Sequence, residues 1–203
     1  MPIDKSIDYS AITPEIKALT KLCLADNVIE PEMYVKYAVN RGLRDLNGNG
    51  VLTGLTEISE IQSSKMVDGE KVPCEGKLFY RGVDVEQIVS GFIREKRYGF
   101  EETVYLLLFG ALPDEAQLDD FKKLLAGYRS LPTNFVRDVI LKAPNADMMN
   151  TLARSVLTLY SYDARATDNS TENVLRQCLQ LIALFPMLSV YGEIGRASCR
   201  ERV

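Results

Sequence analysis

The sequence predicts a mainly α-helical fold with a small β-hairpin element near residues 51–80. From residue 84 onward, apolar side chains return every three to four positions in one segment after another, which is the period of amphipathic helices. The stretch before it carries β-branched runs and the dipeptide Asp68-Gly69, which tolerates the positive φ angles of a tight hairpin turn. At 203 residues, the chain is long enough for one domain with its own core.

The composition is that of an ordinary globular protein, with 46% hydrophobic and 26% charged residues. The net charge is −4 and the basic residues are scattered, so we expect no nucleic-acid partner. The four cysteines include no CxxC pair, which indicates neither a zinc site nor a disulfide framework.

No segment predicts export or membrane insertion. The first ten residues carry Asp4, Lys5 and Asp8, unlike a signal peptide, so we predict a cytoplasmic protein. The uncharged run from Gln177 to Gly192 is shorter than the roughly 20 residues of a membrane span, and we interpret it as a buried helix.

The first elements form a predicted helical arm over residues 1–48. Thr13-Pro14 is a helix start, and Ile16, Leu19, Leu22 and Cys23 then share one face. A second short helix is predicted from Pro31 to about Val39, with Met33, Tyr34 and Tyr37 as its apolar stripe and Gly42 as its stop.

Two short motifs between the arm and the hairpin carry no predicted site. Residues 45–50 open like an EF-hand calcium loop, but its twelfth position is Thr56 where a bidentate Glu is required, so a Gly/Asn-rich turn is the better interpretation. Gly76-Lys77 lacks the spacing of a phosphate-binding loop.

The hairpin is predicted from two strands and two turns. Val51–Ile58 is the first strand, Asp68-Gly69 the first turn, Pro73–Gly76 a second turn, and Lys77–Tyr80 the last strand. Arg81 could bind an anion, but tying the turn to a nearby carboxylate is the more common role of such an arginine.

Helices follow to the end of the chain. Asp84 can cap the first of them, with Gln87 at capping-box spacing. The predicted ranges are 84–94, 100–109, 114–127, 133–142, 147–160 and a last long helix from Ser170.

Their patterns predict three further details. In 100–109, Val104, Leu107 and Leu108 are predicted to face inward, and Glu101-Glu102 to complement the helix dipole. The helix after Asp147 is apolar over most of its circumference, so burial against more than one neighbour is predicted. A kink or break is predicted at Pro186.

Two phrases of this region resemble the citrate synthase family: LFYRGVDVEQIV at residues 78–89 and FEETVYLLLFGALP at residues 100–113. The resemblance extends more loosely over residues 42–192. It implies that residues 49–192 are the N-terminal part of the family's large helical domain, and that residues 1–48 pack on it. It also implies that residues 147–160 lie in a homodimer interface, with burial in the core of one subunit as the alternative.

Residues 193–203, EIGRASCRERV, do not resemble the family's continuation. They look like the translation of a sequencing adaptor, and we predict that they are an artefactual tail.

The resemblance implies a parent acyltransferase of the tricarboxylic acid cycle that condenses acetyl-CoA with oxaloacetate to give citrate and CoA. Acetyl-CoA is then a substrate, and no cofactor or metal is implied. The family uses His, Asp and Arg residues. This chain has no His, and the motifs with the Asp and Arg lie beyond Gly192, so no catalytic, cofactor-binding or metal-binding position is carried over.

The 203-residue chain is therefore expected to be inactive. A 2-methylcitrate synthase using propionyl-CoA is the alternative enzyme, and a non-catalytic helical interaction module is the alternative outside enzymes.

Overall fold

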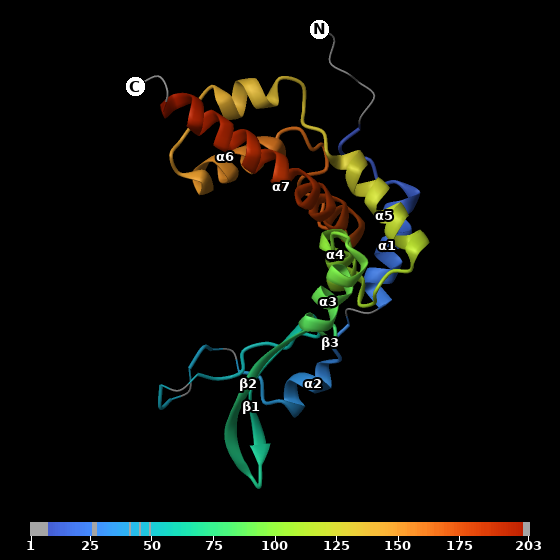
Figure 1. The fold of residues 1–203 in the computed structure, drawn as a ribbon, viewed down its shortest axis with the longest axis vertical. Helices are drawn as coiled ribbons and strands as arrows, with labels where there is room; N and C mark the ends of the chain where they lie inside the picture. Colours follow the sequence, from blue (N-terminus) through green and yellow to red (C-terminus); the bar gives the residue numbers. More distant parts are fainter. Residues whose placement is uncertain (1–7, 26–27, 41, 45, 49, 201–203) are drawn as a thin grey trace. The chain divides into compact units, whose positions relative to one another are not determined.

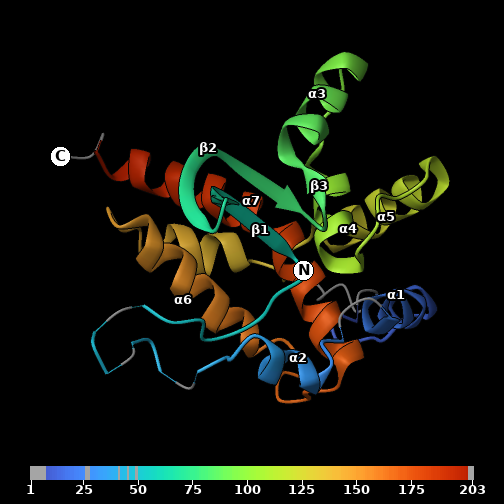
Figure 2. The ribbon, with the colours of Figure 1, turned by 90° about the horizontal axis from the view of Figure 1, so that it is seen from below.

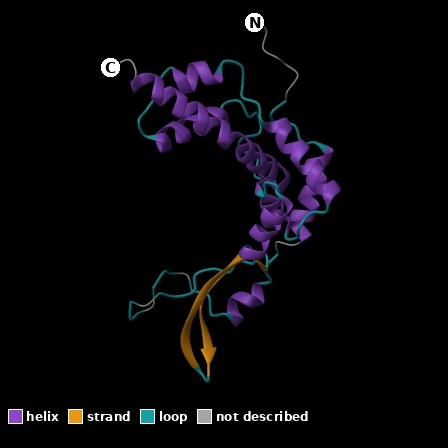
Figure 3. Cartoon of the chain, in the orientation of Figure 1, coloured by secondary structure: helices purple, strands orange, loops and turns teal. Residues whose placement is uncertain are grey.

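The computed structural model describes residues 8–25, 28–40, 42–44, 46–48 and 50–200, with the backbone alone at positions 66, 71, 199 and 200. Most of these residues are helical, and the strands form one three-stranded antiparallel sheet (Figure 3). The predicted fold class is therefore confirmed.

The chain folds as two compact units. Unit 1 comprises Met1–Thr20 and Asp120–Val203, and unit 2 comprises Lys21–Asp119. Unit 2 is thus one continuous stretch, whereas unit 1 joins the start of the chain to its last part. The boundaries at residues 48 and 192 that the sequence suggested stay predictions.

The sheet of unit 2 is a hairpin with a short addition. β1 (Ser59–Val67) pairs with β2 (Glu70–Tyr80), and β3 (Val83–Asp84) pairs with the other edge of β2 (Figure 2). The predicted turn closes the hairpin, with φ of +52° at Asp68 and +85° at Gly69. Positive φ at both central residues is what a two-residue turn requires.

The first predicted strand, Val51–Ile58, is wrong. These residues lie outside the sheet, and β1 begins at Ser59 instead. The turn and the pairing register place Tyr80, the last residue of β2, opposite Ser59. The chain then turns into β3, so the residues before Ser59 have no strand opposite them.

The predicted second turn at Pro73–Gly76 is also wrong, because β2 continues through it. The pairing register nevertheless shifts there, since Gln62 lies opposite Lys77 while Ser64 lies opposite Pro73. Proline cannot donate a ladder hydrogen bond, and a bulge accommodates it without ending the strand.

α1 (Pro14–Ala25) starts where predicted, with the Thr13 hydroxyl accepting from the Ile16 amide at 3.4 Å. Ile16 is fully buried as predicted, but Leu22 is 41% exposed. Thr20 is buried instead, because its hydroxyl donates to the Ile16 carbonyl within the helix at 2.8 Å.

α2 (Pro31–Lys36) is shorter than predicted and ends well before Gly42. The chain leaves the helix through Ala38, whose φ is +49°. The predicted apolar stripe is not buried, since Tyr34 and Tyr37 are each more than two-fifths exposed.

α3 (Val85–Glu95) begins at Asp84, whose Oδ1 accepts from the Glu86 amide at 2.9 Å. α4 (Phe100–Phe109) spans the predicted range and ends at Gly110, whose φ is +83°. Between them the backbone at Gly99 runs against Phe92, such that a Cβ on Gly99 would lie 1.8 Å from the ring.

The predicted inward face of α4 is wrong. Its fully buried residues are Tyr105, Leu106 and Phe109, and the predicted Val104, Leu107 and Leu108 are half-buried. Most residues of α4 are apolar, so the hydrophobic period does not select a face, and packing decides it.

α5 (Glu115–Tyr128) begins in unit 2 with a reciprocal cap and continues into unit 1. The Asp114 amide donates to Gln117 Oε1 at 2.9 Å, and the Gln117 amide donates to Asp114 Oδ1 at 2.8 Å. The helix predicted at 133–142 is present as η1 (Val136–Leu141), which has the wider π-helical winding.

α6 (Met148–Tyr160) is capped by Asp147 as predicted, through the amides of Met149 and Asn150. α7 (Thr171–Arg200) is continuous through Pro186, so of the predicted kink or break the break is wrong and the kink stays a prediction. α7 also continues past residue 193, where Gly195 is buried close to Leu141 of η1. The origin inferred for residues 193–203 stays a prediction.

The core of unit 1 forms where η1, α6 and α7 lie side by side (Figure 1). Phe135, Ile140 and Leu188 are its buried centre. Leu152, Val156 and Leu159 of α6 pack against this centre from one side.

The opposite faces of α6 and α7 are exposed. On α6, Met149 and Leu157 are about three-quarters exposed and Tyr160 is 56% exposed. On α7, Val174, Phe185 and Val190 are between 39% and 59% exposed. The predicted burial of α6 against more than one neighbour is right for the face that contacts α7 and η1, and wrong for the opposite face, which is exposed.

α7 is long and apolar enough over Thr171–Ser198 to cross a membrane, judged by length and composition. A core helix of a globular protein can pass the same test, and 33% of the apolar window is buried in the structure. The interpretation of this region as a buried helix is thus right for one face only.

Candidate functional site

The side chains that the sequence singled out have structural partners. Arg81 donates from Nε and Nη2 to the carbonyl oxygen of Leu107 in α4, at 3.3 and 3.1 Å. Its predicted tying role is confirmed, although this acceptor is a carbonyl where a carboxylate was expected. Glu102 forms an ion pair with Arg97 and is 12% exposed.

The calcium-like stretch cannot be judged in full, because Asp45 and Asn49 lie outside the described residues. Arg44 and Gly50 form an isolated antiparallel bridge, as in a turn, and Arg44 Nη1 donates to the Gly48 carbonyl at 2.8 Å. Within the described ranges, no group of three or more His, Cys, Asp or Glu side chains could hold a metal ion.

Three of the four cysteines have described side chains. Cys23 and Cys74 are half-buried, Cys178 is exposed, and none of these three is in a disulfide. The side chain of Cys199 lies outside the description.

The most concentrated polar group of unit 1 surrounds Arg176 of α7, whose side chain is completely buried. Burial of a charged side chain is rare unless it is paired. Five hydrogen bonds leave its guanidinium, and a guanidinium has five N–H groups. The acceptors are Asp163 Oδ2 at 2.6 Å, Asn173 Oδ1 at 3.0 and 2.7 Å, Gln180 Oε1 at 2.8 Å, and the Tyr9 carbonyl.

Asp163 is the counter-ion and is equally well bonded. Its Oδ1 accepts from the Ser10 hydroxyl and the Arg165 amide, both at 2.9 Å, and its Oδ2 accepts from Arg176 and from Gln177 Nε2 at 2.9 Å. Burial alone would raise the pKa of Asp163, but these four hydrogen bonds outweigh it and lower the pKa to about 2.

We call this network the polar clasp; it consists of Tyr9, Ser10, Asp163, Asn173, Arg176, Gln177 and Gln180. It joins the start of the chain to the loop after α6 and to the first turns of α7, which follow more than 150 residues later. Its charged groups have no N–H or lone pair to spare for a substrate. The clasp can therefore hold structure together, but it offers no base, acid or ligand.

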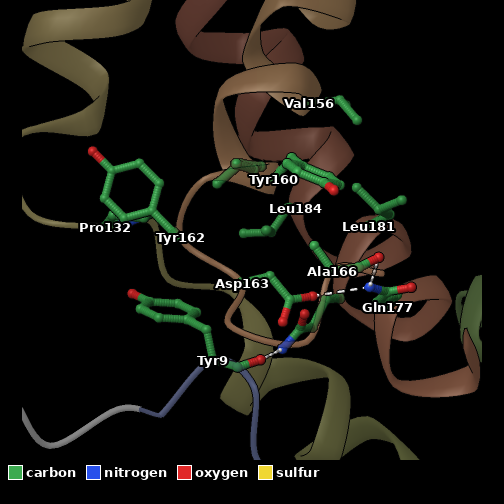
Figure 4. Close-up of a pocket in the computed structure, with 12 residues that line it drawn as sticks. Tyr9, Pro132, Val156, Tyr160, Tyr162, Asp163, Ala166, Gln177, Leu181 and Leu184 are labelled. Atoms are coloured by element: carbon green, nitrogen blue, oxygen red, sulfur yellow. Dashed lines mark hydrogen bonds between the residues drawn. The ribbon is translucent and has the colours of Figure 1, made fainter. Parts of the chain in front are cut away.

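A cavity of about 240 Å³ lies beside the clasp (Figure 4). Tyr9 and Tyr162 stand on one side of it, Tyr160 and Leu184 on another, and Asp163 and Gln177 at its base. The remaining lining residues are Pro132, Val156, Leu159, Ala166, Gln180 and Leu181.

A second hollow of about 280 Å³ lies between the start of the chain and the end of α5. It is lined by Tyr128, among others, and burial raises the pKa of that phenol, while the nearby Arg176 opposes the rise. Neither hollow brings together a nucleophile, a base and an anion-stabilising donor.

Reasoning from the sequence missed the clasp. A signal was present, because Asn173, Arg176, Gln177 and Gln180 recur at helical spacing within an otherwise apolar helix. Their partners at Tyr9 and Ser10 could not be inferred, since nothing local in the sequence links positions more than 150 residues apart.

Comparison with known proteins finds one family model. Residues 45–199 match the model described as the citrate synthase C-terminal domain. A citrate synthase of Saccharolobus solfataricus is 33% identical over 107 residues, which is 52% of this chain and 26% of that protein. The 2-methylcitrate synthase 1 of Corynebacterium glutamicum is 30% identical over 154 residues, 75% of this chain and 36% of that protein.

Among solved structures, the citrate synthase of Pyrobaculum aerophilum is similar, with a TM-score of 0.55 and 26% identity. The similarity covers 74% of this chain and 37% of that one. The chain thus spans between about a quarter and two-fifths of the length of these relatives.

Proposed function

Because the chain belongs to the citrate synthase family, we propose that it is part of an acyltransferase that condenses acetyl-CoA with oxaloacetate to citrate and CoA. The family match carries the proposal, since it covers residues 45–199. The helical fold and its likeness to the P. aerophilum enzyme support it.

The chemistry explains why we propose that the 203-residue chain is itself inactive. The methyl group of a thioester is a very weak acid, so its carboxylate base needs a donor that stabilises the developing enolate oxygen, worth several kcal/mol. The chain has no His. The polar clasp, its best-organised polar group, has all its charges satisfied internally.

An assay of CoA release tests both statements. The 203-residue polypeptide should release no CoA from acetyl-CoA above a buffer blank, with or without oxaloacetate. The source DNA, read past codon 192 from an independent amplicon, should continue into a His-bearing segment, and the product of that longer frame should release CoA only with oxaloacetate. A true stop after Val203 would remove the enzyme proposal.

A 2-methylcitrate synthase is the second candidate, because the C. glutamicum relative of that name aligns over three-quarters of this chain. The longer product would then use propionyl-CoA in preference to acetyl-CoA. Comparing kcat/KM for the two thioesters decides between the candidates.

We also propose that the enzyme is a cytoplasmic homodimer without nucleic-acid or membrane partners. The exposed apolar residues Met149 and Leu157 of α6 support an interface on that helix. Sedimentation of the longer product tests the dimer.

A further inference from the structure

The cavity beside the polar clasp has no part in the proposed reaction, and its walls indicate a separate use. They come from the start of the chain, from α6 and the loop after it, and from α7 (Figure 4). Because the clasp ties these segments together, the cavity keeps its shape as long as the clasp is intact.

The chemistry of the walls selects against anions. Asp163 is the charged residue of the lining, and its carboxylate already accepts four hydrogen bonds, including those from Arg176 and from the Arg165 amide. An anion would meet the Asp163 carboxylate with no Lys or Arg side chain among the described lining residues.

Apart from Asp163, Gln177 and Gln180, the lining residues are aliphatic or aromatic. Tyr9, Tyr160 and Tyr162 present three rings to the space, and aromatic rings bind other rings edge-to-face or offset-stacked. The volume of about 240 Å³ exceeds the roughly 150 Å³ of an engineered apolar cavity that binds benzene. There is room for two fused rings.

We propose that this cavity binds a neutral aromatic molecule of one or two rings. Indole is a suitable probe, because the chain contains no Trp and the fluorescence of indole is therefore not masked. The full 203-residue chain should change the emission of indole in a saturable way, whereas anionic indole-3-acetate should bind at least tenfold more weakly.

Two alanines of the loop after α6 provide a matched pair of variants. Ala166 lines the cavity, so Ala166→Phe should fill it and weaken indole binding at least tenfold. Ala164 is exposed and lies outside the lining, so Ala164→Phe should leave binding unchanged. Circular dichroism of both variants verifies that they are folded.

A third variant separates the cavity from the exposed apolar faces. Leu157→Ser removes an exposed side chain of α6 and should not alter indole binding. The proposal is overturned if indole does not bind, if Ala166→Phe binds indole as the unchanged chain does, or if Leu157→Ser removes the binding. If Ala166→Phe is unfolded, Tyr160→Ala at the rim of the cavity should still lower the affinity, and an unchanged affinity would overturn the proposal.

Discussion

At the scale of the residue, the absence of a Cβ at Gly99 allows the backbone between α3 and α4 to lie against the Phe92 ring. A Cβ there would lie 1.8–2.1 Å from three atoms of the Phe92 ring. Gly99→Ala should therefore displace that ring and lower the free energy of unfolding by about 1–3 kcal/mol, as overpacking does. Urea titration followed by circular dichroism measures it.

Gly91 in α3 is the matched control, because a Cβ there meets nothing within 4 Å. Gly91→Ala should be neutral or stabilising by up to about 1 kcal/mol, since alanine is the better helix former. Equal losses for both substitutions would contradict the packing explanation.

The charged pair of the polar clasp is the other decisive feature at this scale. Asp163→Asn leaves the buried Arg176 without a counter-ion, which should cost about 3–5 kcal/mol of unfolding free energy. Asp138→Asn removes a carboxylate from an exposed, solvated pair with Arg137 and should have a much smaller effect. Thermal unfolding of the two variants side by side would show whether burial makes the difference.

The lowered pKa of Asp163 predicts that the free energy of unfolding decreases at acidic pH. The pKa of Asp163 is about 2 in the folded chain and about 3.9 in an unfolded one. A lowered folded pKa means stability that is present above about pH 4 and is lost as the pH falls toward 2, amounting to about 2 kcal/mol. Urea midpoints between pH 6 and pH 2 should show this loss, and Asp163→Asn should lack that part of it.

These residues also show which structural roles can be predicted from the sequence. Local roles were predictable, including the Asp84 and Asp147 caps and the turn at Asp68-Gly69, because each depends on neighbours within a few positions. The clasp was not, because Arg176 and Tyr9 are 167 residues apart. The exposure of apolar side chains on α6 was not predicted either. An apolar pattern indicates which side chains favour burial, but not whether another element lies against them.

At the scale of the element, two interactions at the N-terminus of α3 can be compared by substitution. Asp84 both caps the helix and lies 3.5 Å from Lys77 of β2. Asp84→Ala should cost about 1 kcal/mol through the lost cap. Lys77→Ala should cost less than about 0.5 kcal/mol, because the pair is solvated. If the two losses were equal, the ion pair rather than the cap would be the source.

The sequence predicted whether a segment is a helix or a strand better than it predicted where that element begins and ends. α4 begins and ends where its sequence pattern does, between Gly99 and Gly110. β1 does not, because its start is set by pairing with β2 and not by its own residues. The π-helical winding of η1 was not predicted either, since the apolar period over six residues does not distinguish it from an α-helix.

At the scale of the whole molecule, the uncovered faces of α6 and α7 should dominate behaviour in solution. Met149 and Leu157 are each about three-quarters exposed, and extended apolar surface of this kind drives association. The purified 203-residue chain should bind a hydrophobic dye or aggregate. Replacing both residues with Lys should reduce dye fluorescence and light scattering, and a compact, dye-silent monomer of the unchanged chain would refute the prediction.

The discontinuous make-up of unit 1 has a consequence for how the protein is synthesised. Tyr9 and Ser10 leave the ribosome early, but their partners Arg176 and Gln180 come some 167–171 residues later. At roughly 5–20 residues per second, the first segment waits about ten to thirty seconds for them. Unit 2, which is continuous, can collapse during that interval, so the order of translation favours completing the inserted unit before the ends of the chain meet.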